Sequence, residues 1–225
     1  MEYRHELKYL VSDAQLAILR ARLTPLMKLD SHQPDPRGYL IRSLYFDDID
    51  NRFLQENMYG LDDRVKFRVR IYDCSDETIH LETKFKYRNL TRKAMCSISR
   101  AQCDDLIAGK PPVFSKDLPK PLRHLYLEMA SSLLRPRIIV EYQRVAFVEP
   151  IGNVRVTFDR NIASSTALTR FFDSKLPLVP LLPPGQHILE VKYDELIPDY
   201  LVQTMDLGDL SQNTFSKYAM CRCAL

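Results

Sequence analysis

The chain has 225 residues, of which 45% are hydrophobic and 27% charged, and its formal net charge is +3. These values are ordinary for a globular protein, and the length suffices for one large domain or two small ones. The modest net charge excludes a histone-like coat for nucleic acid. Any affinity for anions must therefore come from clustered bases rather than from the total charge.

The termini and the cysteines bear on the compartment. The start of the chain, Met1 to Glu6, is too polar for a signal peptide, and no apolar run approaches the roughly 20 residues of a membrane span. The five cysteines are odd in number and contain no CxxC pair, which favours reduced thiols over disulfides or a structural zinc site. The sequence therefore predicts a soluble, cytoplasmic protein.

Alternating side chains and helix-capping patterns predict strands mixed with helices. Strands outnumber helices and come as adjacent runs, which indicates an α+β fold with an antiparallel sheet. The proline-rich stretch Asp173–Gln186 is a long connection between strands, so we expect one domain over residues 1–225. In chain order we expect a strand at Tyr3–Val11, a helix from Ser12, strands at Tyr39–Phe46, Val65–Tyr72, Ile79–Phe85 and Lys93–Ile98, helices from Ser99 and at Pro119–Leu134, strands at Arg137–Val148, Val154–Asp159 and Ile188–Tyr193, and helices at Asp199–Met205 and from Ser211 to the end.

The polar faces of these strands are unusually rich in bases. Since side chains alternate across a strand, Lys66, Arg68 and Arg70 share one face of the third strand and Val65 and Phe67 the other. Applied to six strands, the same rule gives polar faces with ten bases and only four acids. The bases are Arg4, Lys8, Lys66, Arg68, Arg70, Lys84, Lys86, Arg144, Arg155 and Lys192, and the acids are Glu6, Glu82, Asp159 and Glu190.

Two interpretations of these faces remain open. An antiparallel sheet can expose one charged face to water, which would make each face ordinary. So many like charges repel one another, however, unless an anion neutralises them, and guanidinium groups suit phosphate. Closing the sheet into a barrel would gather the bases around a slim anionic ligand. A carboxylate among phosphates favours a divalent metal, for which Glu190 is the first candidate and Glu82 the second; each could instead pair with its neighbouring lysine.

A series of short motifs then resembles a known family. The motifs are Tyr3-Arg4-His5-Glu6-Leu7-Lys8-Tyr9, Ser43-Leu44-Tyr45-Phe46-Asp47, Phe67-Arg68-Val69-Arg70, Glu82-Thr83-Lys84, Glu141-Tyr142-Gln143-Arg144, Glu190-Val191-Lys192-Tyr193 and Ser216-Lys217-Tyr218. Each is weak alone, but in this order they resemble the VTC (vacuolar transporter chaperone) polyphosphate polymerase domain, a branch of the CYTH-like triphosphate tunnel metalloenzymes.

The resemblance implies a closed eight-stranded antiparallel β-barrel, the triphosphate tunnel, with helices on the outside. It implies transfer of the γ-phosphoryl group of ATP, or of another triphosphate, to inorganic polyphosphate with Mn²⁺ or Mg²⁺. Carried over by motif position, the catalytic residues are Arg68, Arg70, Lys84, Arg144 and Arg155. Lys8, Lys192, Ser216 and Lys217 would bind substrate, and Glu190 the metal.

The chain departs from the family pattern in two respects. Hydrolytic relatives begin with an E-x-E-x-K motif, whereas this chain has Arg4 in place of the first acid. Losing that carboxylate should weaken a second metal that could activate water, which favours transfer over hydrolysis. The chain also lacks the regulatory domain and membrane helices of eukaryotic polymerases, so the resemblance is to a free-standing, prokaryotic-type version.

The residues suggest a mechanism and leave alternatives. The five catalytic bases would hold a triphosphate in line while Glu190 holds the metal. Lys8 and Lys192 would bind the incoming phosphate chain. The terminal oxygen of that chain is already anionic, so its attack needs no general base. The basic run from Lys86 to Lys93 would attract polyanions to the entrance, or would be a solvated hairpin. The alternatives are an inorganic tripolyphosphatase or nucleoside triphosphatase, and a non-catalytic module binding polyphosphate or an inositol phosphate. We expect no nucleic acid partner, because the aromatic side chains mostly alternate onto the apolar faces.

Overall fold

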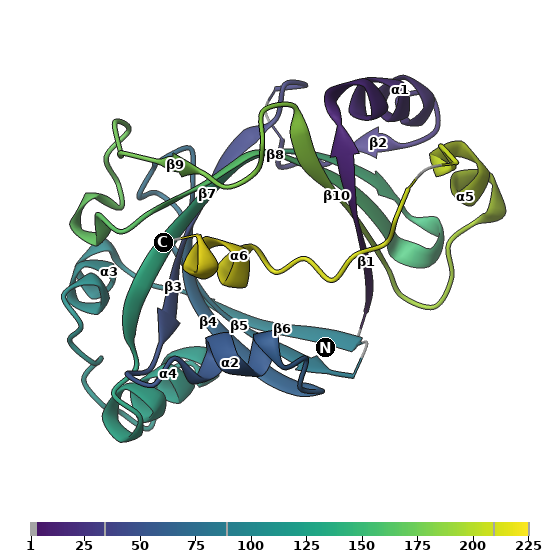
Figure 1. Ribbon diagram of the computed structural model, residues 1–225. Coiled ribbons are helices and arrows are strands. Elements are labelled where there is room, and N and C mark those ends of the chain that lie inside the picture. Colours follow the sequence, from purple (N-terminus) through teal and green to yellow (C-terminus); the bar gives the residue numbers. More distant parts are fainter. Residues whose placement is uncertain (1–3, 34, 89, 209, 225) are drawn as a thin grey trace.

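A computed structural model describes residues 4–224 except 34, 89 and 209. The fold is α+β and antiparallel, as the sequence predicts, and a single sheet organises it (Figure 1). Among the described residues this sheet has ten strands. They are β1 (His5–Ser12), β2 (Lys28–Leu29), β3 (Tyr39–Asp47), β4 (Asp63–Tyr72), β5 (His80–Tyr87), β6 (Leu90–Ser97), β7 (Arg135–Glu149), β8 (Val154–Ser165), β9 (Val179–Pro180) and β10 (Gln186–Tyr193).

Each of the eight longer strands overlaps a predicted one, although β6 begins before the predicted Lys93 and β8 runs past the predicted Asp159 to Ser165. The order β1-β10-β8-β7-β3-β4-β5-β6 is antiparallel at every step. The short strands β2 and β9 pair with β7 and β8 and were not predicted. Tyr3, the first residue of the predicted N-terminal strand, lies outside the described residues.

The sheet curves round on itself but is not the closed barrel that the resemblance implies. Its terminal strands β1 and β6 meet, within the described part of the chain, at a single antiparallel bridge between Arg4 and Thr91 rather than along a ladder. The backbone of each residue donates to the other at 3.1 Å. The sheet therefore differs from the expected barrel in its closure and in its ten strands. It surrounds a central space (Figure 1), and among the described residues its two ends are bridged only at Arg4 and Thr91.

Helices cover the convex side of the sheet, while the last one lies across its opening (Figure 1). Their bounds are α1 (Asp13–Leu23), α2 (Arg52–Met58), α3 (Arg100–Ile107), α4 (Lys120–Ser131), α5 (Asp199–Met205) and α6 (Lys217–Cys223), with short 3₁₀ turns η1 (Ile151–Asn153) and η2 (Leu168–Arg170). No helix among the described residues is long and apolar enough to cross a membrane.

Local sequence explains where the helices begin. Ser12 and Ser99 each form the predicted capping box, at the start of α1 and α3. Helix α2 was not predicted, because Asn51 at its N-cap is left-handed and makes no side-chain cap bond. The final helix begins at Lys217 rather than near Ser211, since the preceding segment is extended: Asn213 donates its backbone N–H to the Lys8 carbonyl at 2.8 Å.

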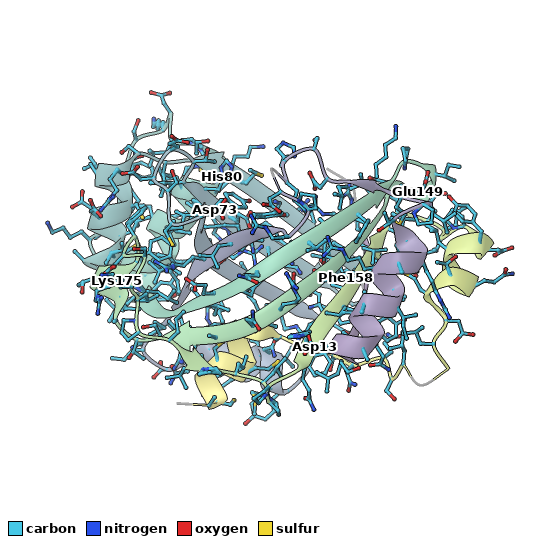
Figure 2. The ribbon with its side chains drawn as sticks, turned by 90° about the horizontal axis from the view of Figure 1, so that it is seen from above. Asp13, Asp73, His80, Glu149, Phe158 and Lys175 are labelled. Carbon is cyan, nitrogen blue, oxygen red and sulfur yellow. The ribbon has the colours of Figure 1, made fainter. Side chains whose placement is uncertain are left out.

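The apolar core lies in two clusters, and most of their side chains are on the convex side of the sheet. One packs α2, α3, α4 and α6 against strands that include β3–β7, and the other packs α1 and α5 against β1, β7, β8 and β10. In the second cluster Leu16, Leu19 and Leu23 of α1 lie with Phe158, beside which α1 runs in Figure 2. Because the apolar side chains of each strand point outward to these helices, the alternate, charged side chains point into the central space.

Candidate functional site: a basic cavity inside the sheet

The concave face of the sheet encloses a cavity of about 670 Å³. Side chains from β1, β3, β4, β5, β7 and β10 line it, together with the segment that leads into α6. Eleven of the lining residues are bases and three are acids. The bases are Lys8, Arg64, Lys66, Arg68, Arg70, Lys84, Lys86, Arg88, Arg144, Lys192 and Lys217, and the acids are Glu6, Asp62 and Glu190.

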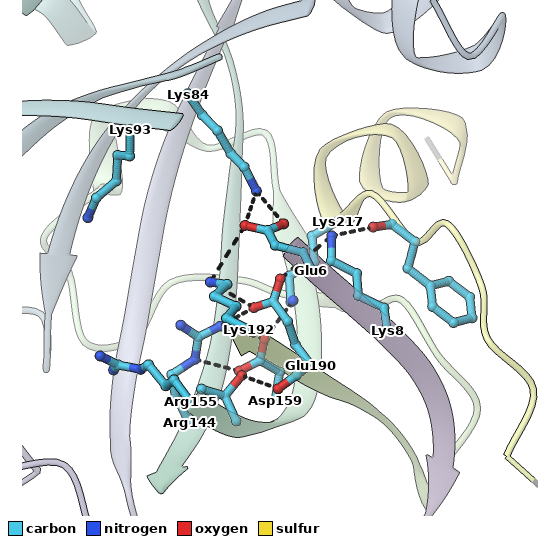
Figure 3. Close-up of polar contacts among 12 residues, drawn as sticks. Glu6, Lys8, Lys84, Lys93, Arg144, Arg155, Asp159, Glu190, Lys192 and Lys217 are labelled. Carbon is cyan, nitrogen blue, oxygen red and sulfur yellow. Dashed lines mark hydrogen bonds and ion pairs between the residues drawn. The ribbon is translucent and has the colours of Figure 1, made fainter. Parts of the chain in front are cut away.

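Glu190 lies at the centre of one group of bases in the cavity (Figure 3). Its carboxylate is 3.1 Å from the Lys192 ammonium, 3.5 Å from the Arg144 guanidinium and 3.7 Å from the Lys8 ammonium. The residue is 4% exposed. Burial alone would raise the pKa of Glu190, but the surrounding cations hold it well below its ordinary value, so the group is a carboxylate. Register places it there, since Glu190 of β10 is opposite Lys8 of β1.

Asp159 organises the neighbouring corner. Arg144 donates to both of its oxygens, at 2.6 and 2.7 Å, and the Lys217 ammonium from α6 lies 2.6 Å away. Asp159 is fully buried; burial alone would raise its pKa, but Arg144 and Lys217 lower it to about 2. This bidentate pair fixes the Arg144 guanidinium beside Glu190 and holds the first residue of α6 inside the cavity.

Glu82 anchors the bases of the facing wall. It is fully buried and lies 2.6 Å from Arg68, 3.2 Å from Lys93 and 3.8 Å from Arg70. Although burial opposes its charged form, these cations hold its pKa well below the ordinary value. Arg68 also donates to the Tyr45 hydroxyl at 2.9 Å. Glu82, the second metal candidate, is therefore an ion-pair partner and is not among the residues that line the cavity.

Glu6 and Lys84 form a pair across the junction between the ends of the sheet. The Lys84 ammonium donates to both carboxylate oxygens of Glu6, at 2.8 and 3.0 Å, and Lys192 lies 4.0 Å away (Figure 3). Burial would raise the pKa of Glu6, but the lysines lower it to about 2. Burial lowers the pKa of Lys84 to about 8, despite Glu6. Lys84 is therefore a cation that titrates close to neutral pH.

The segment before α6 contributes polar groups from the C-terminal part of the chain. The Lys8 ammonium donates to the Phe215 carbonyl at 2.8 Å, and Lys66 donates to the Ser216 hydroxyl at 2.8 Å and to the Asn57 side-chain oxygen at 2.6 Å. Ser216 also caps α6 by accepting from the Ala219 N–H. Lys66 shares the face of Arg68 and Arg70 but was not among the predicted site residues, because no family motif includes it. Parity was the signal that could have found it.

Two bases that the sequence places on the inner strand faces, Arg155 and Arg4, do not line the cavity. Arg155 is not among the residues that line the cavity; its guanidinium pairs with Asp30 at 2.7 Å and donates to the Tyr39 hydroxyl at 3.3 Å. Arg4 pairs with Asp194 at 3.0 Å, and its side chain is 45% exposed. The structure thus brings together nine of the ten predicted site residues, Lys8, Arg68, Arg70, Lys84, Arg144, Glu190, Lys192, Ser216 and Lys217, and separates Arg155 from them.

The cavity offers few ligands for a metal. Within the described residues no group of three His, Cys, Asp or Glu side chains is arranged to hold an ion. Glu6 and Glu190, both within reach of Lys192, are nevertheless two oxygen donors that face the cavity. Mg²⁺ is commonly held by one or two carboxylates together with substrate phosphates and water. The residues therefore fit a metal that arrives with phosphate, and not one caged by protein alone.

A buried carboxylate fixes α6 in place. Asp47 at the end of β3 accepts the Tyr218 hydroxyl and the backbone N–H groups of Phe53 and Leu54, at 2.9 and 3.1 Å. The Tyr218 ring stacks on Tyr45 with centroids 5.3 Å apart. The motifs that contain Tyr45, Asp47 and Tyr218 thus meet in one contact, which holds Ser216 and Lys217 at the cavity.

The fold and the cavity together define an α+β protein whose curved antiparallel sheet gathers bases around an interior cavity. The profile of the VTC domain family matches residues 3–225, so the chain belongs to the VTC domain family. The resemblance seen in the sequence motifs is therefore confirmed. No curated protein matches the chain.

Solved structures with related folds span nearly the whole chain. A candidate adenylate cyclase from Vibrio parahaemolyticus has a TM-score of 0.54 at 11% identity and covers 97% of both chains. One from Bacillus halodurans has 0.52 at 16% identity, covering 90% of this chain and 86% of its own. A Pyrococcus horikoshii protein has 0.52 at 11% identity, covering 99% and 100%. At such low identities these likenesses show the fold alone.

Proposed function

We propose that the protein is a metal-dependent polyphosphate polymerase, which transfers the γ-phosphoryl group of ATP to a growing polyphosphate chain within the cavity. The observation that carries the proposal is the composition of the cavity lining, with eleven bases against three acids in a space of about 670 Å³. Such a surface suits a slim polyanion, because fixed cations balance its charge without reorganisation. Membership of the VTC domain family supports the same class of ligand.

The bases divide into roles by position. Arg68, Arg70, Lys84 and Arg144 would hold the triphosphate, since guanidinium groups held by carboxylates are already oriented when the substrate arrives. Lys8 and Lys192, on the adjacent strands β1 and β10, would bind the incoming chain. Ser216 and Lys217 would complete the site from the C-terminal segment. Arg155, predicted among the catalytic bases, has no role in this proposal, because it lies apart from the cavity.

Glu190 and Glu6 would hold Mn²⁺ or Mg²⁺ jointly with phosphate oxygens. When bound, the metal would supply neutralisation of charge on the transferring phosphoryl group. Lys8, Lys192 and Arg144 lie within 3.7 Å of Glu190 and would turn toward phosphate when the carboxylate takes up the ion. The terminal oxygen of the incoming chain is anionic, so no side chain has to remove a proton from it.

Transfer is favoured over hydrolysis by the position of Arg4. The hydrolytic relatives carry a carboxylate where this chain has Arg4, whose guanidinium pairs with Asp194 at 3.0 Å. Strands β1 and β10 therefore present two carboxylates to the cavity among the described residues, Glu6 and Glu190. Fewer metal ligands leave less support for a second ion that would activate water.

The test is incubation of the purified protein with ATP and Mn²⁺ or Mg²⁺, with the products resolved on a gel stained for polyphosphate. We expect acid-stable polymer from the wild type and from the exposed-lysine control Lys116→Gln. We expect none from Glu190→Ala or Arg68→Ala, and a sharp loss from Lys84→Gln. Thermal unfolding checks that each variant is folded.

Other outcomes select other functions. Release of phosphate from tripolyphosphate without polymer would select a tripolyphosphatase of the same fold. Tight binding of polyphosphate without turnover would select a binding module. Wild-type activity in both Glu190→Ala and Arg68→Ala would contradict the assignment of the site.

A further inference from the structure

Two rungs of the ladder between β4 and β5 place base opposite base. Arg64 lies opposite Lys86, and Lys66 lies opposite Lys84. All four side chains line the cavity, and the two rungs are neighbours on the same face of the ladder. Like charges directly opposite each other on antiparallel strands are destabilising. A sheet that keeps two such rungs side by side is therefore arranged for something other than its own stability.

The next rung shows how the protein neutralises a base when the fold requires it. There Arg68 lies opposite Glu82, which it contacts at 2.6 Å. Lys84 has Glu6 at 2.8 Å. No carboxylate of the described residues lies within ion-pair distance of Arg64, Lys66 or Lys86, although Asp62 attracts both Arg64 and Lys86 from farther away. The ladder thus changes from paired to unpaired bases as it runs from Arg68 toward the start of β4.

The contacts of the unpaired bases are with neutral groups. Arg64 donates to the Asn57 carbonyl at 3.3 Å, and Lys66 donates to the Asn57 side-chain oxygen and the Ser216 hydroxyl. Burial lowers the pKa of Lys66 well below its ordinary value, and the nearby bases Lys8, Lys84, Arg64 and Arg68 lower it further. An anion beside Lys66 would relieve this repulsion.

The paired bases face a different balance. Seven lining bases, Lys8, Arg68, Arg70, Lys84, Arg144, Lys192 and Lys217, form ion pairs with Glu6, Glu82, Asp159 or Glu190. A phosphate that binds them shares them with a carboxylate already in place. A phosphate that binds Arg64, Lys66 or Lys86 displaces no carboxylate of the described residues. Anion affinity per base should therefore be highest at the unpaired end of the cavity.

We propose that Arg64, Lys66 and Lys86 form a separate anion subsite, which holds the phosphate units of a linear polyphosphate that extend beyond a bound triphosphate. The inference rests on the proposed function, because it takes the carboxylate-paired bases as the triphosphate site. Lys84 joins the two regions, since it contacts Glu6 and lies opposite Lys66. A linear chain can therefore pass from one to the other without interruption, whereas a triphosphate held by the paired bases leaves the outer rungs unfilled.

Affinity for two phosphate chains tests the subsite. The double variant Arg64→Gln/Lys86→Gln is compared with wild type by titration calorimetry, using tripolyphosphate and a long-chain polyphosphate at one salt concentration. A charge-assisted hydrogen bond contributes enough for a loss of about tenfold in affinity. We expect at least this loss, about tenfold or more, for the long chain, and a change within about twofold for tripolyphosphate. Lys116→Gln/Lys175→Gln, which removes two exposed lysines, is the matched control and should bind both ligands as wild type does.

The outcomes separate the subsite from the polymerase proposal. An equal loss for both ligands, or no loss for either, overturns the division of the cavity. Selective loss of long-chain binding in a protein that never forms polymer from ATP supports the subsite while the polymerase function fails. A wild-type protein that binds neither ligand overturns both. Coincident thermal unfolding of the variants and wild type shows that the lost affinity does not come from unfolding.

Discussion

Replacing Tyr218 with Phe would remove one hydroxyl and leave the rest of the α6 anchor in place. That hydroxyl donates to the buried carboxylate of Asp47 and accepts from the Arg222 guanidinium at 2.9 Å. Burial and the adjacent Asp47 raise the pKa of Tyr218, so the hydroxyl stays protonated and donates throughout the working pH range. The ring, stacked on Tyr45, fits equally well as phenylalanine and leaves no cavity.

The expected loss follows from the charged partners of the hydroxyl. A hydrogen bond to a charged group contributes about 1.5–3 kcal/mol, and Asp47 loses one such donor. Asp47 keeps the backbone N–H groups of Phe53 and Leu54, and Arg222 keeps the Asn51 side-chain oxygen at 2.6 Å. Neither charge is left bare, so we expect a loss of about 2 kcal/mol in the free energy of unfolding, near the lower end of that range.

Urea unfolding and hydrogen exchange measure the two consequences. Tyr218→Phe should lower the unfolding midpoint at unchanged m-value, and the backbone amides of α6 should exchange faster than in wild type. Because α6 carries Lys217 into the cavity, affinity for tripolyphosphate should fall by up to about tenfold. Tyr59→Phe, at a side chain that is 78% exposed, is the control. A Tyr218→Phe protein within about 0.5 kcal/mol of wild type, with unchanged α6 exchange, would refute the anchor.

Three further predictions concern titration and thiol reactivity. Burial lowers the pKa of Lys84 to about 8, so affinity for tripolyphosphate should fall as pH rises through 8. Calorimetry in buffers of different ionisation enthalpy should detect proton uptake on binding, and Lys84→Arg should flatten the pH profile. Burial would raise the pKa of Glu6, but its lysine neighbours lower it from 4.5 to about 2. Its contribution to the free energy of unfolding is therefore complete above pH 4.5 and lost toward pH 2. Urea unfolding of Glu6→Gln should show a free energy of unfolding that depends less on pH in this range than that of wild type. Burial raises the pKa of Cys103 to about 12, so a thiol reagent should modify exposed Cys223 and spare Cys103 in the folded protein, as peptide mass spectrometry can check.

The strands could be predicted from sequence because their pattern is local. Polar and apolar residues alternate along each strand, which predicts both the strand and its two faces, and eight strands were placed in this way. Helix α2 could not be found, because its N-cap residue, Asn51, is left-handed and makes no side-chain capping bond; Phe53 and Leu54 donate their backbone N–H groups instead to Asp47, six and seven residues earlier. The incomplete closure of the sheet depends on how Arg4 and Thr91 meet, and no local pattern in the sequence specifies that contact.

Parity determined which face a base occupies but not its depth along the sheet. Lys66 and Arg155 both have the parity of the inner face, yet Lys66 lines the cavity and Arg155 pairs with Asp30. Asp30 directly follows the short strand β2, which was not predicted and which pairs with β7. The partner of Lys84 is Glu6, 78 positions away in the chain. Long-range partners such as these decide which bases are free, and a single sequence does not contain them.

The four buried or nearly buried carboxylates explain how so basic a cavity can exist in a folded protein. Each of Glu6, Glu82, Asp159 and Glu190 contacts at least two bases, so bases that would repel one another instead share an acid. Because the acids are fewer than the bases, the cavity keeps a surplus of positive charge, and the ion pairs hold the bases in a fixed geometry. Removing one carboxylate would leave several buried cations uncompensated, whereas removing one base leaves its acid with other partners. The acids of the inner face therefore hold the bases in place in addition to any part they take in the proposed metal site, and the excess of bases leaves positive charge for the ligand.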